Sequence, residues 1–296
     1  MTTIEWFGCT TFRVRVAGLT LWFDTYVDRV PAAEPVGITS GEITEADLVF
    51  VSHAHFDHIL GADTIAAATG CAVVCSYESQ RILRANGVPD EQLLPVSGGE
   101  TVDCGAGVTV RVFPALHSCL WAASDADAGV PCCGDLGVFH QERRHRTKEL
   151  MGLLTSLGDE LRDYHEAIAD RVSPDDGGQL TYLLETAVGS ILISSSSGYW
   201  SGVLAGLRAD VAILAAAGRP NLDGEPFQGS MAEFISAQVQ ALQPSTVILS
   251  HHDAWMPPIP AIDTTAIAAT LAADAPATRL LTLGYGEPTV VLPPAP

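Results

Sequence analysis

The sequence predicts an α/β fold in which two mixed β-sheets lie face to face with helices outside them, plus a helical insert. Short runs rich in β-branched and aromatic residues fill the first hundred positions, which is typical of strands. Both halves of the chain continue as alternating strands and helices. Between the halves, a charged stretch with good helix-forming residues interrupts the strands. This order favours two packed sheets over one doubly wound sheet.

The first half is predicted to form a β-meander followed by a β/α unit. Gly8 and Gly18 mark turns between the first three strands. Residues 61–69 are predicted to form a helix. The predicted strands are residues 4–7, 11–16, 19–23, 47–52, 71–75 and 109–113.

The second half follows a predicted helical insert at residues 118–179, within a single domain of residues 1–296. Leucines recur at helical spacing from Leu150 to Leu161, and a Pro/Gly-rich stretch ends the insert. The insert is expected to act as a lid or as a dimerisation element, so a homo-oligomer is one alternative. Later elements are the predicted strands 180–185, 190–194, 211–214, 246–249, 279–282 and 289–292, and the predicted helices 231–242 and 262–273.

The charge balance excludes several classes of partner. The chain has 296 residues with 15 Lys+Arg and 35 Asp+Glu, a net charge of −20, and a hydrophobic fraction of 47%. Without a basic stripe, binding to nucleic acid or to an anionic membrane surface is disfavoured. No apolar run approaches the about 20 residues that span a bilayer, so no membrane insertion is expected.

The N-terminus and the cysteines favour a cytoplasmic protein. Glu5, Arg13 and Arg15 interrupt the first apolar stretch, which lacks the layout of a secretory signal. The seven cysteines are an odd number, and a chain of this size does not need disulfides, so reduced thiols are expected. The adjacent Cys132 and Cys133 are interpreted as ordinary loop or core residues.

The most informative stretch is His53-x-His55-x-Asp57-His58, directly after a predicted buried strand. Residues two apart on an extended segment point to the same side, so His53 and His55 can converge on one cation. Asp57 and His58 lie at the turn into the next helix and can face a second position. Imidazoles with a carboxylate suit Zn, Fe or Mn, and three protein ligands with an open position are typical of a catalytic site.

Two further histidines follow predicted strands. His117 comes after residues 109–113 and His251 after residues 246–249, and both are predicted ligands. The neighbouring His252 points in a different direction from His251. The histidines of the charged insert are interpreted as solvated or substrate-facing: His140, His145 and His165.

These motifs make the chain resemble the metallo-β-lactamase-fold metallohydrolases, the αββα sandwich superfamily. Leu249-Ser-His251-His-Asp253-Ala-Trp255 is similar to the closing motif of the branch that includes ascorbate-6-phosphate lactonase-like and acyl-ethanolamine phospholipase-like proteins. The stretch from Trp6 to Phe12, leading to Asp24, resembles the same branch. The resemblance implies that His53, His55 and His117 hold a first metal, and that Asp57, His58 and His251 hold a second.

One position departs from that family. Its members place a metal-bridging aspartate after the strand at residues 190–194, where this chain has Ser196. A hydroxyl is a poor ligand, so the second metal is expected to bind weakly, or only one metal to bind. Asp24, expected to support the site from a neighbouring strand end, or Asp253 is an alternative carboxylate. Asp24, Ser196 and Asp253 are therefore predicted to surround the ligands.

The expected chemistry is hydrolysis. A cation in an open site lowers the pKa of bound water towards neutrality and polarises the bond under attack. Asp57 is the candidate catalytic residue, because a carboxylate beside that water can take and return its proton. The expected cofactor is zinc, as one or two ions, with Mn or Fe as alternatives.

The substrate is expected to be a small molecule with an ester, lactone or related carbonyl bond. Five aromatic residues close to predicted ligands are candidate substrate contacts: Phe56, Trp121, Tyr199, Trp200 and Trp255. Only Arg219 and the run at residues 143–146 offer cationic anchors. Two alternatives remain, namely a phosphodiesterase or phospholipase-like hydrolase, and a metal-poor binding protein on the same fold.

Overall fold

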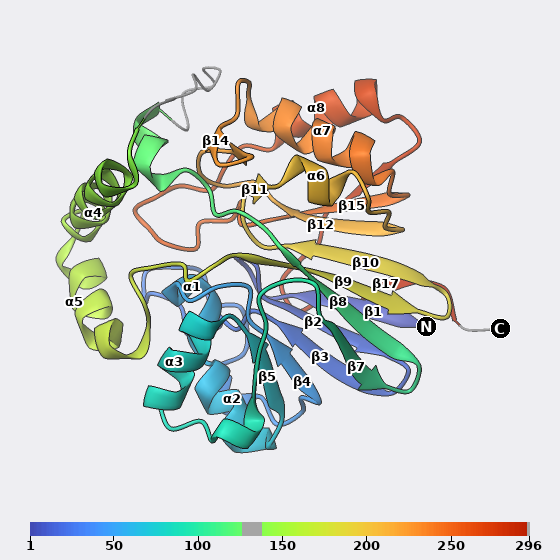
Figure 1. The fold of residues 1–296 in the computed structure, drawn as a ribbon, viewed down its shortest axis with the longest axis horizontal. Helices are drawn as coiled ribbons and strands as arrows, with labels where there is room; N and C mark the ends of the chain where they lie inside the picture. The colour runs from blue at the N-terminus through green and yellow to red at the C-terminus, as the bar shows by residue number, and fades with distance from the viewer. Residues whose placement is uncertain (126–137, 295–296) are drawn as a thin grey trace.

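The fold is a sandwich of two mixed β-sheets with helices on both outer faces, as a computed structural model of residues 1–125 and 138–294 shows (Figure 1). The predicted fold class is confirmed. The adjacent Cys132 and Cys133 lie outside the described residues.

The first seven-stranded sheet has the order β17-β1-β2-β3-β4-β5-β6. Its strands are β1 (Thr2–Trp6), β2 (Phe12–Val16), β3 (Leu19–Phe23), β4 (Leu48–Phe50), β5 (Ala72–Cys75), β6 (Leu93–Pro95) and β17 (Thr289–Leu292). The first three strands pair antiparallel, which confirms the predicted meander. From β3 to β6 the pairing is parallel, so β3, β4 and β5 end at the same edge.

The second seven-stranded sheet has the order β16-β15-β12-β10-β9-β8-β7. Its strands are β7 (Thr101–Gly105), β8 (Val108–Pro114), β9 (Leu180–Thr186), β10 (Gly189–Ser194), β12 (Val211–Ala215), β15 (Thr246–Ser250) and β16 (Arg279–Leu281). The four strands from β10 to β16 pair parallel. A small third sheet joins β11 (Gly198–Tyr199), β13 (Asn221–Leu222) and β14 (Glu225–Pro226).

Helices cover the outer faces of both sheets. On the first sheet lie α1 (Phe56–Ile59), α2 (Ala62–Thr69) and α3 (Tyr77–Ala85), and on the second lie α6 (Ser201–Leu204), α7 (Met231–Leu242) and α8 (Thr265–Asp274). The predicted helix at residues 231–242 is reproduced, whereas α3 was not predicted. Short 3₁₀ turns are η1 (Ser40–Glu42), η2 (Asp90–Gln92), η3 (Leu120–Asp125) and η4 (Ala169–Arg171).

The helices α4 (His140–Thr155) and α5 (Asp159–Ile168) fall inside the predicted insert and lie outside the two layers, at one side of the molecule (Figure 1). Leu161 and Ile168 of α5 are buried against Phe56, Tyr26 and other residues beside the start of α1. This packing fixes α5 next to the loop that follows β4.

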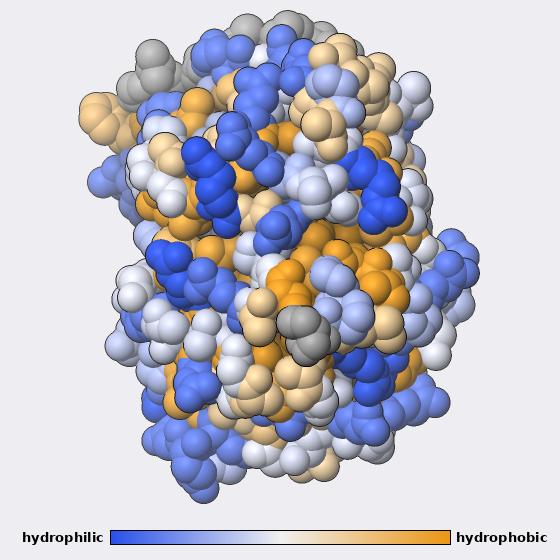
Figure 2. Space-filling view, turned by 90° about the vertical axis from the view of Figure 1, so that its right-hand side faces the viewer, coloured by the Kyte–Doolittle hydropathy of each residue, from blue (hydrophilic) through white to orange (hydrophobic). Residues whose placement is uncertain are grey.

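Three apolar layers account for the high hydrophobic fraction. Between the sheets, residues such as Phe50 of β4 pack against Ile193 of β10. The other face of the first sheet, including Val73, packs on Ile65 of α2, and the outer face of the second packs on α7 and α8. On the face that carries the chain ends, apolar residues show between hydrophilic ones (Figure 2). Among the described residues, no helix combines the length and apolar character needed to cross a membrane.

Candidate metal centre

Three histidines meet at the edge where the parallel strands end. His53 follows β4, His55 immediately precedes α1 and His117 follows β8. Nε2 of His53 lies 3.2 Å from Nδ1 of His55, and that atom lies 3.1 Å from Nε2 of His117. Facing ring nitrogens compete for protons, whereas one cation accepts a lone pair from each of them. We call His53, His55 and His117 the histidine cluster.

Outer contacts fix the rings of this cluster. Nδ1 of His117 donates to the backbone oxygen of Ser118 at 3.0 Å. Nδ1 of His53 lies 3.1 Å from the hydroxyl of Ser52. These partners hold the ring orientations and leave Nε2 of both residues directed into the cluster, the arrangement found around metal-binding histidines.

Burial keeps the cluster neutral. It lowers the pKa of His53 well below its usual value, and the neighbouring His58 lowers it further. Burial and the adjacent His117 lower the pKa of His55 to about 3, and burial also lowers the pKa of His117. A neutral imidazole is the form that donates a lone pair to a metal ion, so the donor set fits a cation.

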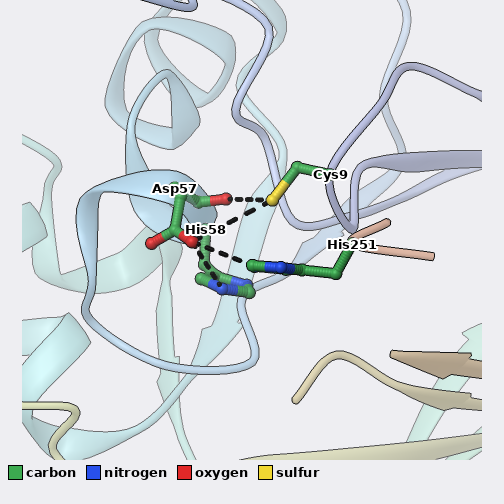
Figure 3. A group of neighbouring side chains, drawn as sticks. All are labelled: Cys9, Asp57, His58 and His251. Atoms are coloured by element: carbon green, nitrogen blue, oxygen red, sulfur yellow. Dashed lines mark hydrogen bonds and ion pairs between the residues drawn. The ribbon is translucent and has the colours of Figure 1, made fainter. Parts of the chain in front are cut away.

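A second group contains a thiol, a carboxylate and two imidazoles (Figure 3). Oδ2 of Asp57 lies 3.1 Å from Nε2 of His251 and 3.4 Å from Nε2 of His58. Sγ of Cys9 lies 4.0 Å from the same oxygen. The four ligand atoms all lie within 4.8 Å of one another. We call Cys9, Asp57, His58 and His251 the cysteine cluster.

The two clusters share a wall. The ring centroids of His53 and His58 lie 3.8 Å apart. Asp57 and His58 follow His55 directly on α1, so one short helix connects the clusters. The arrangement can therefore hold two cations in neighbouring positions.

A buried carboxylate stands behind the cysteine cluster. Oδ2 of Asp24 lies 2.8 Å from Nδ1 of His58 and accepts a hydrogen bond from the Thr10 hydroxyl at 2.8 Å. Its Oδ1 accepts from the backbone N–H of Ser52 at 2.7 Å.

The charges in the cysteine cluster shift one another's pKa values. Burial alone would lower the pKa of His58, but Asp57 and Asp24 raise it to about 10. Burial would raise the pKa of Asp57, but His58 and His251 hold it well below its usual value.

Comparison with known proteins identifies the family. Residues 20–147 match the family model described as a beta-lactamase superfamily domain. Over 161 residues the chain is 36% identical to a UPF0173 metal-dependent hydrolase of Pyrobaculum calidifontis, covering 52% of this chain and 68% of that protein. The chain belongs to the UPF0173 metal-dependent hydrolase family, within the β-lactamase superfamily. A Pyrobaculum arsenaticum member is 33% identical with the same coverage, 52% and 68%.

Solved structures share the fold of this UPF0173 member. Igni18, a metallo hydrolase from Ignicoccus hospitalis, superposes with a TM-score of 0.61 at 17% identity and covers 97% of each chain. An isothiocyanate hydrolase from Delia radicum gut bacteria gives 0.60 at 13% identity and covers 98% of each chain. The diiron β-hydroxylase CmlA from Streptomyces venezuelae gives 0.59 at 15% identity, covering 97% of this chain and 54% of that one.

The two alternative carboxylates of this UPF0173 hydrolase are engaged elsewhere. Asp253 forms an ion pair with Arg29, and its Oδ2 accepts from Tyr285 at 2.7 Å while its Oδ1 accepts from the Cys9 backbone N–H at 3.0 Å. Asp24 is engaged with His58. Among the described residues, neither Asp24 nor Asp253 belongs to a group of side chains that could together hold a metal ion.

Ser196 lies after β10, beside the histidine cluster. It is buried, and its hydroxyl accepts a hydrogen bond from the Ser118 backbone N–H at 3.1 Å. Ser118 directly follows His117. The hydroxyl therefore holds the loop that carries His117 in place.

The five aromatic residues predicted to contact the substrate lie in three different places. Phe56 and Trp255 lie by the clusters, with ring centroids 5.9 Å apart, and Trp255 lies 4.9 Å from His251. Trp121 is covered by the guanidinium of Arg143 from α4, at 4.1 Å. Tyr199 and Trp200 line a small cavity under α6 whose lining includes none of the described histidines.

The insert reaches the clusters through α5. The ring of His165 lies 4.7 Å from that of Phe56, and its Nε2 is buried without a hydrogen-bond partner among the described residues. His145 and His140 are exposed on α4. His252 stacks on Trp6, with centroids 5.1 Å apart, and turns away from the cysteine cluster.

Sequence reasoning missed two residues of this centre, Cys9 and Thr10. Both lie in the turn between β1 and β2 and come into contact with α1 only in the folded chain. The available signal was their position in the stretch from Trp6 to Phe12, directly after the first predicted strand.

Proposed function

We propose that this metal-dependent hydrolase cleaves a small, partly apolar ester or lactone, with the histidine cluster as its first metal site. The observation that carries the proposal is the convergence of three neutral ring nitrogens, 3.1 and 3.2 Å apart, at the edge where the strands end. When bound there, a cation supplies a hydroxide at neutral pH and polarises the carbonyl oxygen.

The residues around that position have separable roles in the proposal. Ser52 and Ser118 orient the rings of His53 and His117. Asp57 is proposed as a ligand in the cysteine cluster through Oδ2, since that oxygen faces His58 and His251. Its Oδ1 is then the atom proposed to accept a proton from the attacking water.

Apolar side chains support a substrate with an apolar portion. Phe56 and Trp255 form an aromatic wall beside His251, and α5 packs against Phe56. We propose that α5 and α4 limit the space over the clusters, as a lid does. Such a wall binds an acyl chain or ring by excluding water from it.

A phosphodiester is the second candidate substrate, because of Arg219. This residue is only 7% exposed, and Nε of its guanidinium has no hydrogen-bond partner among the described residues. Its backbone oxygen accepts from Cys119 N–H, two residues after His117. Within the described residues Arg219 forms no ion pair, and burying an unpaired arginine is costly, so an anionic substrate group would offset that cost.

A substrate panel distinguishes the two candidates. Zinc-loaded protein is assayed with a series of lactones, aryl esters of short acids and an aryl phosphodiester at equal concentration. The proposal expects kcat/KM for the best ester or lactone to exceed that for the phosphodiester by about 10-fold or more, equivalent to ~1.4 kcal/mol. The reverse order supports the phosphodiesterase. No turnover of any substrate by metal-loaded protein supports a binding protein.

A further inference from the structure

We propose that Cys9 is the fourth protein ligand of the second cation, completing a Cys-Asp-His-His site with Asp57, His58 and His251. The inference rests on the proposed metal centre but not on the identity of its substrate. A sulfur ligand makes the site of the second cation selective for thiophilic divalent cations.

The distances in the cysteine cluster fit such a site. A tetrahedral ion bound at about 2.0 to 2.3 Å places its ligand atoms roughly 3.3 to 3.6 Å apart. In the structure Oδ2 of Asp57 lies 3.1 Å from His251 Nε2, 3.4 Å from His58 Nε2 and 4.0 Å from Cys9 Sγ. Figure 3 shows the sulfur of Cys9 facing Asp57, with dashed lines to its carboxylate and to its backbone oxygen, the latter at 3.5 Å. The four ligand atoms all lie within 4.8 Å of one another, so small movements of the side chains would bring them to the spacing of a tetrahedral site.

The turn that carries Cys9 is fixed before any ion binds. The backbone N–H of Cys9 donates to Asp253 at 3.0 Å, and its oxygen accepts from His251 N–H at 2.8 Å and from Trp6 Nε1 at 3.0 Å. Cys9 has φ of 47°, a left-handed conformation that a residue with a side chain adopts at a cost. These hydrogen bonds hold that conformation and direct the sulfur at Asp57.

The network behind the turn is also buried. Arg29 and Asp253 form an ion pair whose side chains are 3% and 7% exposed. A Cβ at Gly8 would lie 2.7 Å from Arg29 Nη2, so the preceding position is packed closely against that pair. A ligand on so rigid a turn loses little conformational freedom when it binds an ion.

The chemistry of the donor set explains what the sulfur contributes. With Ser196 after β10, the centre lacks the carboxylate that the superfamily resemblance places there. A thiolate supplies one negative charge and a soft donor atom, which together with Asp57 balances a divalent cation. Thiolate favours zinc, and cadmium or cobalt as probes, over manganese and magnesium. His58 is held for this role by Asp24, as a carboxylate behind a metal-binding histidine.

A competing interpretation is that Cys9 is only a small apolar residue. It is fully buried, and Tyr26 and Phe56 belong to the same apolar group. Free cysteines commonly occupy such positions without any chemical role. The two interpretations differ in whether the sulfur bonds to an added ion.

The test is titration of metal-free protein with Co²⁺, which reports on sulfur ligands through a thiolate-to-cobalt charge-transfer absorption in the near ultraviolet. Wild type is compared with Cys9→Ser and with the control Cys71→Ser, a buried cysteine before β5 that lies outside both clusters. Cobalt content after gel filtration and the thermal unfolding midpoint of each metal-free protein are measured in parallel.

Wild type and Cys71→Ser are each expected to bind two equivalents of Co²⁺. The charge-transfer band is expected to grow as one of these two equivalents binds. Cys9→Ser is expected to lack the band. Its affinity for the second cobalt ion is expected to fall by about 100-fold or more, which is the upper end of the loss seen when a hydrogen-bond partner of a metal ligand is removed. A band that persists in Cys9→Ser, or a wild type without a band at any cobalt concentration, overturns the proposal. If Cys9→Ser fails to fold, Cys9→Ala is titrated in its place, and a band that persists in that variant overturns the proposal.

The outcome is separable from that of the proposed function. A charge-transfer band without any esterase or lactonase activity supports the Cys9 site and contradicts the proposed substrate. Lactone hydrolysis by a protein that binds cobalt without the band contradicts the Cys9 site alone.

Discussion

Nδ1 of His58 lies 2.8 Å from Oδ2 of Asp24, while Nε2 of the same ring lies 3.4 Å from Oδ2 of Asp57. One imidazole thus joins a buried carboxylate at the end of β3 to the cysteine cluster. Such a pair fixes the ring orientation and strengthens the lone pair that faces an ion.

Asp24→Asn is expected to weaken the second metal by about 10- to 100-fold, because the amide loses the charge behind His58. Asparagine tolerates the left-handed backbone of this position, where φ is 50°, so the fold is expected to persist. Competition with a chromophoric chelator measures the affinity. The matched control is Asp47→Asn, whose carboxylate accepts from Thr20 N–H at 2.7 Å at the other end of the strands. Equal affinity in both variants would contradict the role of Asp24.

His55→Ala is expected to abolish binding of the first metal and to lower kcat/KM by about 100-fold or more. The reason is that a cation supplies several kcal/mol of transition-state stabilisation, and each ~1.4 kcal/mol is tenfold in rate. His145→Ala is the control, since that side chain is 65% exposed on α4. Metal content by mass spectrometry and initial rates are the measurements. Retained activity in His55→Ala would place the first metal elsewhere.

Ser196→Asp is expected to tighten the second metal by adding a carboxylate where β10 ends. The new side chain can still accept from the Ser118 N–H that Ser196 binds at 3.1 Å. Because ligands that bind only the folded state stabilise it, zinc should raise the unfolding midpoint more in the variant than in wild type. An unchanged metal stoichiometry and midpoint would show that this position does not face the ion.

Arg29→Met is expected to lower the free energy of unfolding by about 3 to 5 kcal/mol, because it leaves Asp253 buried without its partner. The control is Arg84→Met. Arg84 pairs with Asp90, but their side chains are 50% and 69% exposed, so a change within about 1 kcal/mol is expected. Urea unfolding of the metal-free proteins measures both. A loss below ~1 kcal/mol in Arg29→Met would contradict the importance of the buried pair.

Much of the fold could be predicted because its strands are apolar runs between clear turns. The predicted strand at residues 19–23 and helix at residues 231–242 match β3 and α7. The helix α3 was missed because its sequence has few apolar residues, with only Ser79, Ile82 and Leu83 buried. Local signals were nevertheless present, since the Ser76 side chain caps the helix by accepting from the Ser79 backbone N–H, and Ile82 and Leu83 form the face that packs on the first sheet.

The centre could be predicted only where its residues are close in sequence or follow strands. His53, His55, Asp57 and His58 lie in one motif, and the strand ends bring His117 and His251 to it. Cys9 could not be predicted from spacing, since its turn meets Asp253 across 244 positions. Tyr199, predicted as a substrate contact, packs on Phe234 of α7 with ring centroids 5.2 Å apart.

We propose that the converging histidines make this chain a metal-dependent esterase or lactonase. The most direct measurement is hydrolysis of the best lactone or aryl ester by chelator-treated protein before and after stepwise addition of zinc, with bound metal counted in the same samples. We expect no hydrolysis without metal. In wild type, but not in His55→Ala, the rate should recover in proportion to occupancy of the first site. Hydrolysis at the full rate by protein that holds no metal would contradict it.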